Sequence, residues 1–267
     1  MQPIRSLERP AMPARGAQHS SWIALLAAWL ILLVIAPAAQ AAAPPNIVFI
    51  LADDLDWRST VHMPELQALA RQGATFEGAY MTTPICVPSR ATILTGKYPQ
   101  NSGVRSNRPP TGGYHAFYEG GREDDTVAVW LRQAGYRTAM IGKYFNYYPD
   151  PAPPLHVPVG WTYWAVPENH ADMHAKYNYT LNVNGTRVAY GNAKRDYSTD
   201  VFAARARAFI ADSDVRERPF ALFLWFPSPH VKEVPASRHA DLFPRLRAPR
   251  LVSFPELDMS DKPPFMR

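Results

Sequence analysis

Several residues that could do chemistry follow stretches that are expected to form strands. The carboxylates Asp53-Asp54 end the apolar run at 46–52, Lys143 follows the expected strand at 136–141, and His230 comes after the apolar run at 219–226. Adjacent carboxylates supply the anionic oxygens that Ca²⁺ and Mg²⁺ prefer. Taken singly, each residue also has an ordinary explanation: a helix cap, a surface lysine or a loop histidine. Because all of these residues follow expected strands, together they favour a single shared site.

Cys86 is the single cysteine of the chain. It cannot form an internal disulfide, and a free cysteine is most often a small buried hydrophobe. Its neighbours change that interpretation, because 86–96 reads C-V-P-S-R-A-T-I-L-T-G. This stretch matches C-x-P-S-R-x-x-x-L-T-G, the signature of the formylglycine-dependent sulfatases, at every fixed position. A second stretch, 135–143, resembles the Gly-Tyr and Gly-Lys signature of the same family.

Within the family, the chain most resembles the N-acetylglucosamine-6-sulfatases and the related heparan sulfate 6-sulfatases. The stretches that carry this resemblance are 94–99, 142–144, 156–161, 177–181 and 229–230. The resemblance implies a sulfated carbohydrate substrate, with 6-O-sulfate of N-acetylglucosamine or glucosamine as the group removed. Arylsulfatases share much of this framework, so an arylsulfatase of other specificity stays an alternative. A phosphoesterase on the related scaffold would carry serine or threonine in place of Cys86.

The resemblance also implies a mechanism. A formylglycine-generating enzyme oxidises Cys86 to an aldehyde, whose hydrate attacks sulfur and later expels sulfate by breaking a C–O bond. Asp53, Asp54 and the modified Cys86 are then ligands of a divalent cation, usually Ca²⁺. Three further catalytic roles follow from the family: Arg90 holds the modified side chain, Lys143 binds a sulfate oxygen, and His230 protonates the leaving alcohol.

The local patterns predict alternating strands and helices. Strands are expected at 46–52, 75–80, 136–141 and 219–226, and a hairpin at 180–190 around Asn184-Gly185. Helices are expected at 64–72, from Ser89 to 94, at 126–134 with Asp125 as N-cap, and at 198–210. The near-continuous apolar run at 46–52 predicts a strand buried on both faces. Together these elements predict an α/β fold. The family resemblance makes it an alkaline-phosphatase-like sulfatase domain with a mixed, mostly parallel sheet between helices.

The amino-terminal segment predicts export. A basic stretch up to Arg15 precedes an uncharged run at 22–36, and Ala39-Gln40-Ala41 matches a cleavage pattern. We therefore assign 1–43 to a cleavable signal peptide of a periplasmic or secreted protein, with an uncleaved membrane anchor as the alternative. Cleavage would leave no stable membrane association. The net charge of +5 is small and scattered, which argues against nucleic acid as a partner.

The family resemblance leaves part of the site unaccounted for. Family members use a later Asp-Asn pair as metal ligands, and no such dipeptide follows His230. We therefore expect 44–267 to be an incomplete, amino-terminal sulfatase domain, truncated at the carboxy end, with an irregular tail at 235–267. Such a chain should expose an apolar sheet edge, bind Ca²⁺ weakly and show no measurable activity by itself. A catalytically inactive sulfatase-like exported protein is thus the second hypothesis.

Overall fold

The computed structural model describes residues 44–212, 217–230, 233–247, 258 and 260–262. Residues Pro45–Arg267 form one compact unit, distinct from Met1–Pro44. The predicted signal peptide at 1–43 therefore lies outside the described residues. In the described part of the chain, no helix is both long and apolar enough to cross a membrane.

A six-stranded sheet organises the unit, with the strand order β1-β6-β2-β3-β4-β5. The first four strands in this order, β1, β6, β2 and β3, run parallel to one another. Strand β4 pairs antiparallel with β3 and with β5. The strands are β1 (Ile47–Ala52), β2 (Arg137–Gly142), β3 (Tyr163–Pro167), β4 (Tyr179–Val183), β5 (Thr186–Tyr190) and β6 (Phe220–Phe226). The fold is therefore α/β with a mixed, mostly parallel sheet, as the sequence predicts.

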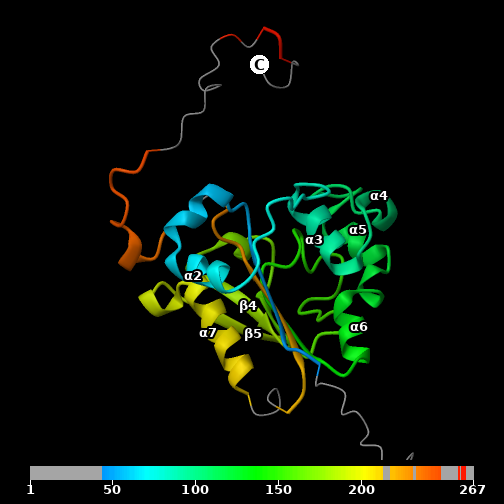
Figure 1. Cartoon of the computed structure of the whole chain (residues 1–267). Coiled ribbons are helices and arrows are strands. Elements are labelled where there is room, and N and C mark those ends of the chain that lie inside the picture. Colours follow the sequence, from blue (N-terminus) through cyan, green and yellow to red (C-terminus); the bar gives the residue numbers. More distant parts are fainter. Residues whose placement is uncertain (1–43, 213–216, 231–232, 248–257, 259, 263–267) are drawn as a thin grey trace, which may run out of the picture. The chain divides into compact units, whose positions relative to one another are not determined.

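Helices cover both faces of this sheet (Figure 1). Helices α3, α5 and α6 pack on one face through the larger core cluster, whereas α7 packs on the other. The α-helices of the described residues are α2 (Pro64–Gln72), α3 (Cys86–Thr95), α4 (Pro99–Ser102), α5 (Gly113–Glu119), α6 (Val127–Gln133) and α7 (Ser198–Ala211). The 3₁₀ turns are η1 (Trp57–His62), η2 (Arg122–Asp124), η3 (Asp172–His174), η4 (Lys194–Asp196) and η5 (Ser237–His239).

The central strand β6 shows why the apolar runs form this sheet. Its alternate residues Phe223 and Trp225 belong to the cluster under α3, while Leu222 and Leu224 belong to the cluster under α7. Successive side chains of a strand point to opposite faces, so a strand between two helical layers must be apolar throughout. The apolar run at 219–226 therefore forms a strand that is buried on both faces.

Burial on both faces was predicted for the run at 46–52, and this prediction is wrong. The run forms β1, which lies at the edge of the sheet. Val48 is 48% exposed and Ile50 is 57% exposed, and they alternate with the half-buried Ile47, Phe49 and Leu51. One face of β1 is therefore largely open. An edge strand also leaves backbone N–H and C=O groups free to pair with another strand.

Most predicted elements are confirmed, including the hairpin, in which Asn184 and Gly185 both adopt positive φ as its turn requires. The strand expected at 75–80 is wrong, since that stretch contains only turns and irregular backbone. Thr126, and not Asp125, caps α6 by accepting a hydrogen bond from the N–H of Val129. Helix α3 begins at Cys86, so Ser89 lies inside it. The predicted irregular tail is confirmed where it is described, apart from η5.

Candidate active site

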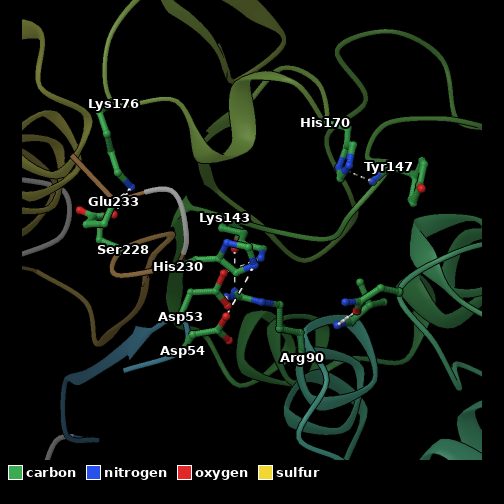
Figure 2. Close-up of polar contacts among 12 residues, drawn as sticks. Asp53, Asp54, Arg90, Lys143, Tyr147, His170, Lys176, Ser228, His230 and Glu233 are labelled. Carbon is green, nitrogen blue, oxygen red and sulfur yellow. Dashed lines mark hydrogen bonds and ion pairs between the residues drawn. The ribbon is translucent and has the colours of Figure 1, made fainter. Parts of the chain in front are cut away.

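The carboxyl ends of three adjacent strands bring the predicted site residues together. Asp53 and Asp54 follow β1, Lys143 follows β2, and His230 follows β6, which lies between those two strands. Parallel strands end at the same edge of a sheet, so residues distant in sequence meet there. Figure 2 shows these side chains converging with Arg90 from α3.

One half of the site is buried and fully paired. Arg90 donates from Nη2 to Asp53 Oδ1 over 2.9 Å, and Lys143 Nζ donates to Asp53 Oδ2 over 2.5 Å. Arg90 also donates from Nη1 to the carbonyl oxygen of Lys143 over 2.9 Å. The exposed fraction of the side chain is 5% for Asp53, 2% for Arg90 and 0% for Lys143. These residues are called the buried half below.

The backbone around Trp225 fixes the position of the buried half. The N–H of Lys143 donates to the carbonyl oxygen of Trp225 over 2.8 Å. Gly142 has φ +99°, and a Cβ there would lie 2.0 Å from that same oxygen, so only glycine allows this approach. The guanidinium of Arg90 lies 5.0 Å from the centroid of the Trp225 ring. The close approach of Trp225 therefore explains why a glycine precedes Lys143 in the second signature.

Charge in the buried half favours a bound anion. Burial by itself would raise the pKa of Asp53, but Arg90 and Lys143 outweigh burial and hold that pKa below its usual value. Asp53 is therefore a carboxylate, and it shares its single negative charge between two cations. One positive charge remains without a counter-ion inside the buried half. A sulfate group beside it would supply that counter-charge.

The other half of the site, here called the open half, consists of Asp54, Cys86 and His230. The side chain of Asp54 is 57% exposed, and its Oδ2 lies 3.6 Å from Nε2 of His230. Cys86 is the first residue of α3 and is half-buried. Asp54 and Cys86 of the open half join Asp53 and Arg90 in lining a pocket of about 390 Å³. A small ligand group can therefore reach Cys86 while touching both halves.

A comparison with protein families identifies this arrangement. The family model described as Sulfatase matches residues 45–244. The chain belongs to the sulfatase family.

Relatives of this chain include proteins that are themselves named sulfatases. It is 36% identical to an N-acetylglucosamine-6-sulfatase of Capra hircus over 229 residues, which cover 83% of this chain and 40% of the relative. It is 34% identical to the extracellular sulfatase SULF-1 homolog of Drosophila melanogaster over 225 residues, which cover 82% of this chain and 19% of the relative.

Among solved structures, that of BT4656 in complex with its substrate D-glucosamine-2-N,6-O-disulfate matches with a TM-score of 0.63 and 26% identity. The match covers 78% of this chain and 39% of that one. The chain thus spans two-fifths or less of the length of these relatives.

The donor groups of the sulfatase site fit part of a divalent-cation shell. Ligand atoms of Asp53, Cys86 and His230 lie within 4.8 Å of one another, and within the described ranges this is the sole group of its kind. Each carboxylate oxygen of Asp53 has two lone pairs, so it can bind a cation while still accepting from Arg90 or Lys143. Asp54 adds exposed carboxylate oxygens beside them. Hard cations take six or more oxygens, so these residues hold one only with further ligands.

All six predicted site residues therefore lie in one place: Asp53, Asp54, Cys86, Arg90, Lys143 and His230. Their individual catalytic and metal-binding roles stay predictions. Sequence reasoning missed two neighbours, His174 and Lys176, which contact the residues around His230. Neither belongs to a motif, and η3 was not predicted. No local pattern in the sequence could have revealed them.

Proposed function

We propose that this chain carries the catalytic residues of a sulfatase that removes 6-O-sulfate from N-acetylglucosamine or glucosamine residues of sulfated glycans. The observation that carries the proposal is that Cys86 lines a pocket together with Asp53 and Arg90. The relatives named N-acetylglucosamine-6-sulfatase and the sugar bound to BT4656 support the choice of substrate.

The residues of this chain suit the separate steps. Formylglycine made from Cys86 presents a hydrated aldehyde, one hydroxyl of which attacks sulfur. The bond between sulfur and the sugar oxygen breaks, its electron pair goes to that oxygen, and His230 donates a proton there. Arg90 lies one helical turn from Cys86 and holds the modified side chain, while Lys143 binds a sulfate oxygen. The second hydroxyl then loses its proton, the C–O bond to sulfate breaks, and the aldehyde re-forms.

A divalent cation, proposed as Ca²⁺, would be held by Asp53, Asp54 and the modified Cys86. When bound, it supplies positive charge that favours ionisation of the attacking hydroxyl and neutralises the sulfate. Even before any cation binds, the excess positive charge of Arg90 and Lys143 over Asp53 attracts the same anion.

The first test is the chemical state of Cys86. Peptide mass spectrometry should show replacement of the thiol by an aldehyde after expression with a formylglycine-generating enzyme. In a full-length version, which supplies the remaining metal ligands, the modified protein should then release sulfate from a 6-sulfated glucosaminide faster than from its 3-sulfated isomer. An unmodified thiol, in a host that modifies another sulfatase, would contradict the proposal.

Two variants of the full-length protein separate the proposed roles. Cys86→Ser should lose turnover and accumulate a sulfate ester on the protein, because serine lacks the second hydroxyl that expels sulfate. Lys143→Ala should lose about 10²-fold or more in kcat without a trapped species, because transition-state charge is no longer stabilised. Intact-mass analysis after incubation with substrate distinguishes the two outcomes. Rates like those of the unsubstituted protein in either variant would refute that assignment.

We also propose export through the segment 1–43, with a formylglycine-generating enzyme as the partner that acts before or during export. The basic start and the apolar run support this proposal. Amino-terminal sequencing of the protein recovered outside the cytoplasm should begin shortly after Ala41. An intact Met1 on membrane-bound protein would instead indicate an uncleaved anchor.

A further inference from the structure

His174 lies directly against His230. The two imidazole rings are stacked, with centroids 4.2 Å apart and planes inclined by 27°. His174 is the last residue of η3, which connects β3 to β4, and it comes from none of the elements that carry the predicted site residues. Burial, followed by the nearby Lys143 and His230, lowers the pKa of His174 to about 3. The ring of His174 is therefore neutral near pH 7.

Lys176, two residues further on, binds the loop of His230 on both sides. Its ammonium donates to Ser228 Oγ over 2.9 Å and pairs with Glu233 Oε2 over 2.9 Å (Figure 2). The Lys176 side chain is only 4% exposed. The carbonyl oxygen of Ser228 also accepts from the N–H of Asp53 over 3.1 Å, which ties this loop to the buried half. One buried cation thus links the residues before and after His230.

The segment that carries both residues, 172–176, is itself anchored to the fold. Asp172 Oδ2 accepts hydrogen bonds from the N–H of Thr180 in β4 and from Asn169 Nδ2, each over 3.1 Å. At the other end, the carbonyl oxygen of Lys176 accepts from the N–H of Ser198, where α7 begins, over 3.0 Å. The segment, called the support segment below, therefore transmits the rigidity of the sheet and of α7 to the loop of His230.

We propose that the support segment positions His230 for proton donation, with His174 fixing the plane of the imidazole and Lys176 fixing its loop. This inference rests on the proposed function, because it takes His230 as the proton donor to the sugar oxygen. His174 and Lys176 are positioning residues that act through His230. Their loss should weaken protonation of the leaving oxygen while leaving the attack on sulfur intact.

The leaving group of the substrate provides a readout that a purely structural role would not change. A sugar alkoxide needs a proton as it leaves, whereas the 4-nitrophenolate of an aryl sulfate is stable without one. In the Cys86-modified protein, His174→Ala and Lys176→Met should each lower kcat for a 6-sulfated glucosaminide by about tenfold or more, part of the roughly 10²–10⁴-fold contributed by a positioned general acid. The kcat for 4-nitrophenyl sulfate should fall by less than about threefold, and KM should stay unchanged for both substrates.

Two further variants serve as controls. His174→Phe keeps an aromatic ring for stacking and should recover most of the kcat for the sugar sulfate. Lys97→Met removes an exposed lysine that pairs with Asp125 away from the site, and it should change neither rate. Equal losses on both substrates, or no loss on the sugar sulfate, would overturn the proposal.

A readout without turnover separates this inference from the proposed function. If the full-length, Cys86-modified protein hydrolyses neither sulfate, the proposed function fails, and the positioning is judged by NMR. Selectively labelled histidine should then show the His230 ring resonances shifting and broadening in His174→Ala and Lys176→Met. The same resonances should not move in Lys97→Met. Unchanged His230 resonances in the first two variants would overturn the positioning role.

Discussion

The two halves of the site differ in how completely the chain itself satisfies them. In the buried half, both oxygens of Asp53 accept from cationic donors, and every side chain is nearly inaccessible to water. In the open half, Asp54 is mostly exposed and meets His230 only across 3.6 Å. The buried half is thus organised before any ligand arrives, whereas the open half keeps ligand atoms available for a cation and a substrate.

This difference follows from where the residues stand in the fold. Arg90 and Lys143 reach Asp53 from α3 and β2, through the densely packed side of the sheet. In the open half, Asp54 follows β1, which is an edge strand with exposed Val48 and Ile50. Well-packed surroundings fix side-chain positions, and an open edge leaves them accessible.

The largest effect is expected from Asp53→Asn, which tests whether the buried half is a structural unit. The substitution leaves Arg90 and Lys143 buried without a counter-charge, so the free energy of unfolding should fall by about 3–5 kcal/mol. Urea unfolding in the presence of a chelator measures this change without a metal contribution. A loss below about 1 kcal/mol would mean that the two cations find other partners and that the half is not preformed.

An intermediate, pH-dependent effect is expected from His174→Phe. His174 has a folded-state pKa of about 3, while an unfolded histidine titrates near 6.5. Above pH 6.5 the residue contributes no pH dependence. As the pH falls from 6.5 toward 3, the unfolded state takes up a proton that the folded state refuses, so the unsubstituted protein loses stability.

Phenylalanine removes this loss. Between pH 7 and pH 5, the stability of His174→Phe relative to the unsubstituted protein should rise by about 1 kcal/mol, a figure reduced for solvent screening of this half-buried ring. Parallel urea titrations at the two pH values measure it. If the difference in stability between the two proteins is the same at pH 7 and pH 5, His174 takes up a proton in the folded protein as readily as in the unfolded one.

The smallest change in stability is expected from Asp54→Asn, which isolates the open half. Its exposed carboxylate makes one long contact, to His230. The free energy of unfolding should therefore change by less than about 1 kcal/mol. The affinity for Ca²⁺, measured by calorimetry on the Cys86-modified protein, should nevertheless fall clearly, because an anionic ligand is lost. Lys97→Met supplies the baseline for an exposed pair. A stability loss as large as that of Asp53→Asn would remove the distinction between the two halves.

Much of the site could be predicted from the sequence because its residues lie in short, ordered motifs. The signature at 86–96 identified Cys86 and Arg90, and the apolar runs placed Asp53, Asp54, Lys143 and His230 after strands. Strand β6 was predicted because burial on both faces requires an uninterrupted apolar run. Strand β3 was missed because Tyr163–Pro167 lies within an aromatic and proline-rich stretch.

By itself, the sequence determined the family, the α/β class and the six residues that meet in the site. Only the tertiary structure decided that β6 lies between β1 and β2, that Asp53 is shared by two buried cations, and that β1 is an exposed edge. It also decided that His174 and Lys176 hold the loop of His230. The physical reason is that periodicity reports only which residues of one element are buried. Contacts between distant elements depend on strand order and packing, which no single segment encodes.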